Sequence, residues 1–158
     1  GYFTRGSGHN EKAQYTERAE DYARNMDRLN RKFESIRRKV PGPALQGVAS
    51  PDIGIIAYGT SHWAVCESID QLGQEHDLGA SYCRLRAFPF NEEVRDFVRR
   101  HPRVYVIDQN RDAQMLHLLK LELDPDEAKK LRSVRHYNGL PIDARTITDS
   151  VVFQEAKK

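Results

Sequence analysis

The sequence predicts an α/β fold in which an open parallel sheet lies between two layers of helices, a three-layer α/β/α arrangement. Three observations predict it. Short apolar runs alternate with helical stretches from residue 53 onward, the connections between them are short, and the run 53–58 (IGIIAY) shows no polar alternation. An unbroken apolar run is typical of a strand covered on both faces, and strand–helix alternation favours parallel strands joined by right-handed crossovers.

A polar segment, residues 1–15, precedes this pattern. Nearly every side chain in it can donate or accept a hydrogen bond, and no apolar periodicity runs through it. We expect a loop belonging to the surface of a longer protein, because a free terminus gains little from such side chains. Folded inward, Arg5 would pair with a substrate carboxylate, and His9 or Glu11, beside Asn10, would move protons. A solvated, disordered tail is the alternative for the isolated chain.

A long amphipathic helix is predicted over residues 16–40. Thr16 is placed to cap it, and Pro41-Gly42-Pro43 ends it. Its apolar residues follow one another at steps of four and three, on a single stripe: Tyr15, Ala19, Tyr22, Met26, Leu29, Phe33, Ile36 and Val40. The stripe would dock on a neighbouring domain or form a coiled-coil seam, and three heptads favour docking. Residues 41–52, rich in Pro and Gly, are predicted to be a linker.

The remaining residues, 53–158, are predicted to form the α/β domain. After the first strand we expect helices over about 61–75, after Asn91, over about 111–123, from Pro125 to about 132, and after Asp143. Strands are expected over 80–86, 103–108 and 133–137. The residues predicted to point inward from the helices are Val65, Ile69, Leu72, Val94, Phe97, Val98, Met115, Leu118, Leu119, Ile147 and Val151.

Polar residues follow the first and third of these strands. In open parallel sheets, ligands bind beyond the carboxyl ends of the strands, so these residues are candidates for ligand binding or subunit contact. They are Thr60, Ser61, His62, Asp108, Gln109, Asn110, Arg111 and Gln114. Helix capping explains Thr60 or Ser61, and Asn110 or Asp112, equally well. The turn at Gly59 matches no phosphate-binding loop motif and no hydrolase nucleophile elbow.

Composition excludes several classes of protein. Charged residues make up 30% and apolar residues 39%, as in a soluble globular domain, and no apolar run is long enough to span a bilayer. The basic residues of 1–39 are interleaved with acids, which favours a solvated face over a nucleic-acid surface. Two cysteines, Cys66 and Cys83, and six scattered histidines form no metal-spaced cluster, and thiols rather than a disulfide suit a cytoplasmic protein.

Five separated blocks carry a resemblance that covers nearly the whole chain: GYFTRGSGHNEKAQYTE, IIAYGTSHWAVCES, RLRAFPFNEEVRDFV, RVYVIDQNRDAQM and GLPIDARTIT. They resemble the C-terminal part of the alpha subunit of 2-oxoacid:ferredoxin oxidoreductases, in the bacterial 2-oxoglutarate-type branch. The resemblance implies that residues from about 50 onward form a transketolase C-terminal-like domain. It also places His9-Asn10-Glu11 in a stretch that approaches the substrate pocket, and Asp108-Gln109-Asn110 at a strand end typical of this domain.

The family decarboxylates a 2-oxoacid with coenzyme A to give an acyl-CoA and CO2, and it reduces ferredoxin. The resemblance implies a complex with thiamine diphosphate, magnesium and an iron–sulfur cluster. This chain lacks the GDG…N pattern of the beta subunit and the cluster cysteines, so we expect it to bind no cofactor and to contact the beta subunit and upstream domains of the alpha subunit. Two alternatives are a free-standing flavodoxin-like module that binds a nucleotide or flavin, and a coiled-coil scaffold.

Overall fold

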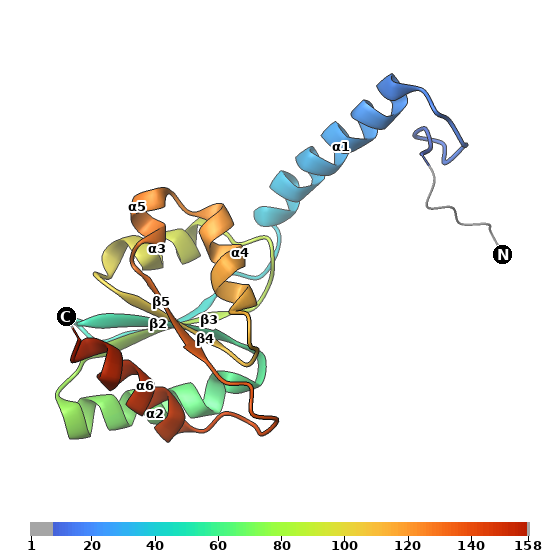
Figure 1. Cartoon of the computed structure of the whole chain (residues 1–158). Coiled ribbons are helices and arrows are strands. Elements are labelled where there is room, and N and C mark those ends of the chain that lie inside the picture. Colours follow the sequence, from blue (N-terminus) through green and yellow to red (C-terminus); the bar gives the residue numbers. More distant parts are fainter. Residues whose placement is uncertain (1–7, 158) are drawn as a thin grey trace. The chain divides into compact units, whose positions relative to one another are not determined.

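The computed structural model describes residues 8–157, which form two compact units that divide after Val40 (Figure 1). The first unit consists of a loop and helix α1. The second contains a five-stranded sheet with helices on both faces, which confirms the predicted α/β fold. No helix within residues 8–157 has the length and apolar character needed to cross a membrane.

Helix α1 spans Ala19–Arg37 and is shorter at both ends than the predicted 16–40. Thr16 does not cap it. The Thr16 hydroxyl instead accepts the Arg18 N–H (3.2 Å) and donates to the Asp21 carboxylate (2.9 Å), which holds the preceding loop against the first turn. The buried residues of α1 are polar, Asp21 and Asn25, whereas Tyr22 of the predicted apolar stripe is 58% exposed.

The sheet of the second unit has the order β1-β3-β2-β4-β5. Its strands are β1 (Ala44–Gln46), β2 (Ile53–Tyr58), β3 (Ala80–Leu85), β4 (Val104–Asp108) and β5 (Leu131–Arg135). The last four are parallel, as predicted, but β1 pairs antiparallel with β3, which makes the sheet mixed. Residues 41–52 therefore contain an edge strand as well as a connection. Its three residues are exposed and too few to show a periodicity, so the sequence pattern did not predict it.

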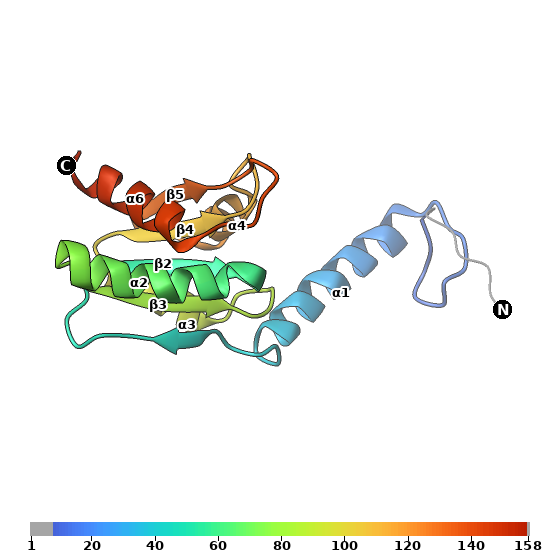
Figure 2. The same cartoon turned by 90° about the horizontal axis from the view of Figure 1, so that it is seen from below.

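Helices cover the sheet in two layers (Figures 1 and 2). On one face, α2 (His62–His76) and α6 (Ala144–Glu155) bury Ile53, Ile55 and Ala57 of β2. On the other face, α3 (Glu92–Arg100) and α4 (Gln114–Glu122) bury Ile56, and the short helix α5 (Pro125–Ala128) follows α4. Burial on both faces explains why β2 is apolar without alternation.

Most residues predicted to point inward do so, including Val65, Leu72 and Ile147, which are fully buried. Helix α4 is the exception. It begins at Gln114 rather than near 111, because Ala113 adopts a left-handed conformation (φ 51°) just before it. Leu116 is buried instead of Leu118, which is 39% exposed.

Glu127 of α5 anchors the end of α4 and the start of β5 to α3. Its nearly buried carboxylate accepts hydrogen bonds from Arg99 (2.7 Å), Arg95 (2.9 Å) and the Asp124 N–H (3.1 Å). Burial by itself raises the pKa of the Glu127 carboxyl, but these hydrogen bonds outweigh it and hold the pKa below its usual value. The ionised form is therefore favoured in the folded state.

We expect Glu127→Gln to reduce stability by about 1–2 kcal/mol at pH 7, since it removes a charge that bonds two guanidinium groups. A lowered pKa in the folded state stabilises the fold above the pKa of the unfolded chain, and this stabilisation is lost as the pH falls through the folded-state pKa. The difference from wild type in urea unfolding should thus shrink below about pH 4. Glu92→Gln, at an exposed partner of Arg99, is the control and should change stability by less than about 0.5 kcal/mol at either pH.

Gly54 lets α3 lie close to β2. A Cβ atom at this position would come within 2.7 Å of Phe97 Cε1 and 3.1 Å of His101 Cγ. The last turn of α3 and the residue after it thus rest directly on the backbone of β2.

Gly54→Ala should therefore destabilise the protein by about 1–3 kcal/mol, because Phe97 and His101 are buried and cannot move away without disturbing the core. Gly73→Ala is the matched control. It lies in α2, and nothing is within 4 Å of the added methyl group, so it should be neutral or stabilise by up to about 1 kcal/mol. Thermal unfolding of both variants measures the difference, and equal melting temperatures would contradict the packing argument.

Candidate functional site

The carboxyl ends of β2 and β4 form the topological switch point of the sheet. After β2 the chain crosses through α2 to β3 on one side, and then through α3 to β4 on the other side of β2. The chain leaves β2 through α2 on one face of the sheet and leaves β4 through α4 on the other face, so the loops after these two strands diverge. Open α/β sheets bind ligands at such a point. Both groups of polar residues predicted from the sequence follow these two strands.

Gln109 joins the two loops. Its Nε2 donates to Ser61 Oγ (3.0 Å) and Thr60 Oγ1 (3.2 Å), and its Oε1 accepts the N–H of Ile142 (3.3 Å). The hydroxyl groups of Thr60 and Ser61 therefore do not cap α2, as one interpretation of the sequence had it, and instead link β2 to the loop after β4. Residues 48 and 49 positions apart in the sequence meet here because parallel strands end at the same edge.

Asp108 and Asn110 organise the start of α4. The buried Asp108 carboxylate accepts the N–H groups of Met115 (3.1 Å) and Leu116 (3.3 Å), the Asn110 amide (3.0 Å) and the Tyr58 hydroxyl (3.3 Å). Burial and the Asp108 charge raise the pKa of Tyr58, which keeps that hydroxyl protonated as a donor. Both carboxylate oxygens are engaged, so Asp108 supports the edge rather than offering a free group to a ligand.

The other predicted residues lie around this centre. Arg111 forms an exposed ion pair with its neighbour Asp112 (2.7 Å), and the Gln114 side chain is exposed. His62 stacks on Tyr82, with 5.8 Å between ring centroids, and its Nδ1 is 3.4 Å from the Tyr82 hydroxyl. These two contacts hold His62 against the sheet, whereas Arg111 and Gln114 lie on the surface.

An apolar pocket of about 290 Å³ opens at the same edge. It lies between Tyr58 at the end of β2 and Gly59 after it, Arg86 and Phe88 after β3, and Met115 of α4. Sequence reasoning missed the β3 side of it, although Leu85-Arg86-Ala87-Phe88 follows a predicted strand and thus ends at the same edge. Large apolar side chains are exposed in the loops and helix starts that follow the strands at this edge: Trp63 (77%), Phe88 (48%), Tyr137 (61%) and Leu140 (70%).

The predicted substrate-pocket residues belong to the first unit. Arg5 lies outside the described residues. Asn10 builds a turn, its Oδ1 accepting the N–H groups of Lys12 and Gln14 (both 3.0 Å), and Asn25 of α1 donates to the His9 carbonyl (2.5 Å). Glu11 pairs with Arg24 (2.9 Å).

The Arg24 hydrogen bond lowers the pKa of Glu11, which favours the ionised carboxylate. The His9 ring is exposed, and its Nδ1 is 2.9 Å from the Asn10 carbonyl. Within the first unit, then, His9, Asn10 and Glu11 form one loop that is held on α1.

Within residues 8–157, no group of three or more His, Cys, Asp or Glu side chains is arranged to hold a metal ion. Cys66 and Cys83 are both free thiols. Burial raises the pKa of Cys83 to about 12, so it stays protonated and is a poor metal ligand.

The observed fold is also that of a known oxidoreductase. The structure of 2-oxoglutarate:ferredoxin oxidoreductase from Magnetococcus marinus, solved with 2-oxoglutarate, coenzyme A and succinyl-CoA bound, superimposes with a TM-score of 0.79 at 20% identity. The match covers 98% of this chain and 27% of that one, so the chain spans about a quarter of the length of this relative.

A second structure, the alpha chain of a probable 2-oxoacid ferredoxin oxidoreductase from Thermoplasma acidophilum, matches with a TM-score of 0.46 at 23% identity. That match covers 74% of this chain and 98% of the other. No protein-family model and no curated protein sequence matches the chain. At 20% identity, the match to the Magnetococcus marinus structure establishes the fold alone.

The contacts of Asp108 predict a structural role that can be measured. Asp108→Asn replaces one acceptor oxygen by an amide that faces N–H donors, and we expect it to lower the free energy of unfolding by about 2–3 kcal/mol in urea titrations. Asp112→Asn, in the same turn but exposed, should cost less than about 0.5 kcal/mol. If Asp108→Asn is as stable as wild type, the carboxylate does not support the edge of the sheet and is available to bind a ligand.

Proposed function

We propose that this chain is the C-terminal part of the alpha subunit of a cytoplasmic 2-oxoacid:ferredoxin oxidoreductase of the 2-oxoglutarate-type branch. The observation that carries the proposal is the structural match to 2-oxoglutarate:ferredoxin oxidoreductase over 98% of the chain. The resemblance of five separated sequence blocks gives further support. The resemblance of the sequence blocks and the match of the backbone both support this proposal.

In this proposal the whole complex decarboxylates a 2-oxoacid oxidatively, joins the acyl group to coenzyme A, and passes two electrons to ferredoxin. Thiamine diphosphate, magnesium and the iron–sulfur cluster belong to other parts of the complex. Two potential metal ligands of this chain support the assignment of the cofactors to other parts of the complex. The Asp108 carboxylate already accepts hydrogen bonds on both oxygens, and the Cys83 thiol is buried and protonated. We therefore derive no chemical step from this chain alone.

The role of the chain in the complex is to hold subunits and domains together. The carboxyl edge of the sheet supports this role, since Trp63, Phe88, Tyr137 and Leu140 expose large apolar surfaces around one edge. Clustered apolar side chains of this size are typical of protein interfaces. We assign this edge to the beta subunit and the exposed stripe of α1, with Tyr22, to upstream domains of the alpha subunit.

A flavodoxin-like nucleotide or flavin module is the second candidate, because an apolar pocket does open at the switch point. The turn after β2 argues against a nucleotide or flavin site. The hydroxyl groups of Thr60 and Ser61 are already bonded to Gln109, and no glycine-rich loop surrounds them. A rise of several degrees in melting temperature with FMN, ADP or coenzyme A would favour this candidate over the interface.

Two assays test the proposal. The isolated chain, given 2-oxoglutarate, coenzyme A, thiamine diphosphate and a dye acceptor, should form no acyl-CoA. In the reconstituted complex, the double substitution Trp63→Ser and Leu140→Ser should weaken binding of the beta subunit at least about thirtyfold, because exposed aromatic and apolar anchors dominate such interfaces.

Phe153→Ser is the matched control, since Phe153 is also a large, mainly exposed apolar residue (59%) but lies in the last turn of α6, away from the carboxyl edge. Binding of this variant should equal that of wild type. Turnover by the isolated chain, or unchanged affinity of the double variant in surface plasmon resonance, would rule out the proposed role.

A further inference from the structure

The outer side of strand β1 is an open margin of the sheet. β1 pairs with β3 on one side, and the strand order places no strand of the second unit on its other side (Figure 2). Residues 44–50, which we call the β1 margin, are all exposed, and Leu45 and Val48 are 45% and 49% exposed. The N–H and C=O groups on the free side of such a strand are a template for pairing with another chain.

The strand at the other margin of the sheet, β5, is protected. The Arg132 guanidinium donates to the Leu131 carbonyl (3.2 Å). The Gln154 amide of α6 donates to the Ser133 carbonyl (3.0 Å), so side chains already occupy two carbonyl groups of this strand. Arg132 and Arg135 also add exposed charges. Natural proteins use charged and covering groups of this kind to prevent pairing between sheets, so the contrast indicates that β1 is left open for a partner.

The β1 margin also carries no charge. Residues 40–51 contain no Asp, Glu, Lys or Arg, although charged residues make up 30% of the chain and residues 44–50 are exposed. An uncharged strand offers no electrostatic signal to an acidic or basic partner. It suits a copy of itself, because a two-fold axis brings each side chain near its own copy, where any charge would repel itself. Pro43 and Pro51 confine the pairing to the residues between them.

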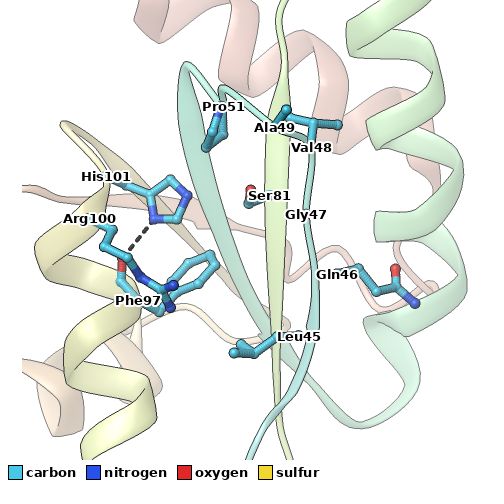
Figure 3. Close-up of a pocket in the computed structure, with 10 residues that line it drawn as sticks. All are labelled: Leu45, Gln46, Gly47, Val48, Ala49, Pro51, Ser81, Phe97, Arg100 and His101. Carbon is cyan, nitrogen blue, oxygen red and sulfur yellow. Dashed lines mark hydrogen bonds between the residues drawn. The ribbon is translucent and has the colours of Figure 1, made fainter.

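Leu45 supplies the apolar contact for such a pairing. It lies opposite Cys83 of β3, whose side chain belongs to the core beneath α3, so the Leu45 side chain is on that same face of the sheet. A pocket of about 480 Å³ lies there, at the amino edge of the sheet (Figure 3). Leu45, Val48 and Phe97 line it beside the buried ring of His101. An apolar side chain from a second copy would extend this surface and remove Leu45 from water.

We propose that two copies of this chain associate through β1. The two strands run antiparallel about a two-fold axis that passes by Leu45, so Ala44 of one copy faces Gln46 of the other and the two Leu45 side chains pack on each other. The pairing joins two five-stranded sheets into one continuous sheet. Because the shared strand is short, the dimer is weak, with a Kd of about 1–100 µM. It goes beyond the function proposed above and does not depend on it.

Sedimentation equilibrium of the 158-residue chain at about 5–500 µM, with a reducing agent present to exclude disulfides, tests the proposal. We expect a monomer–dimer equilibrium for wild type. Leu45→Lys puts two ammonium groups opposite each other at the axis and should raise Kd at least about tenfold. Leu121→Lys is the matched control, since Leu121 is an exposed leucine (82%) of α4, and it should leave Kd unchanged.

A pair of opposite charges separates loss of pairing from loss of folding. Leu45→Lys and Leu45→Glu should each be mainly monomeric. Their equimolar mixture should associate at least about fivefold more tightly than either variant alone, because unlike charges then meet at the axis. Association of the mixture also shows that both variants are folded at β1.

A wild-type chain that stays monomeric up to about 500 µM overturns the proposal. So does a dimer that survives Leu45→Lys but is lost in Met26→Lys, which would assign the association to the exposed stripe of α1. A monomeric chain in which Leu45→Lys weakens binding of the beta subunit would assign the β1 margin to that subunit instead. A mixture of the two charge variants that associates no more tightly than either alone excludes the axis at Leu45.

Discussion

Burial of β2 on both of its faces is the constraint on which the rest of this structure depends. Ile53, Ile55, Ile56 and Ala57 have no exposed surface, so helices must pack on each side of the sheet and no polar side chain can be placed on either face of this strand. Chemistry is thereby confined to the two edges of the sheet. The carboxyl edge holds a cross-linked polar cluster beside exposed apolar side chains, and the amino edge holds a pocket next to the buried ring of His101.

The two edges differ in how far their polar groups satisfy one another. At the carboxyl edge, Gln109 and Asp108 bond to loops and helix starts, which stiffens the edge and leaves its apolar rim as the surface to be covered. At the amino edge, the bond to the Phe97 carbonyl fixes the ring of His101 and leaves Nε2 without a donor.

Helix α1 inverts the usual arrangement of an amphipathic helix. Within its own unit it buries Asp21 and Asn25 against the preceding loop and exposes the apolar Tyr22 and Met26. The loop supplies mainly backbone carbonyls and hydroxyl groups, so the polar face of the helix is the one that it can satisfy. The apolar stripe remains for another surface, in keeping with the proposed role as a joining element within a larger subunit.

The sequence by itself determined the kind and order of most elements, since periodicity is a local property: the two-sided burial of β2, the inner residues Val65 and Leu72 of α2, and the Asp143 cap of α6, which accepts the Thr146 N–H (2.7 Å), are all visible within a few residues. It also placed Gln109 and Ser61 at the same edge of the sheet, because parallel strands end together, whereas the strand order brought them into contact.

Only the tertiary structure decided the features that join distant residues. The strand β1 exists through its pairing with β3, α4 begins where the buried Asp108 carboxylate collects N–H groups, and the apolar stripe of α1 is left uncovered within its unit. The amino-edge pocket depends on His101 lying against Gly54, 47 positions earlier, with β1 opposite. No local pattern contains that contact, because the close approach of a ring to a glycine is set by the packing of α3 on the sheet.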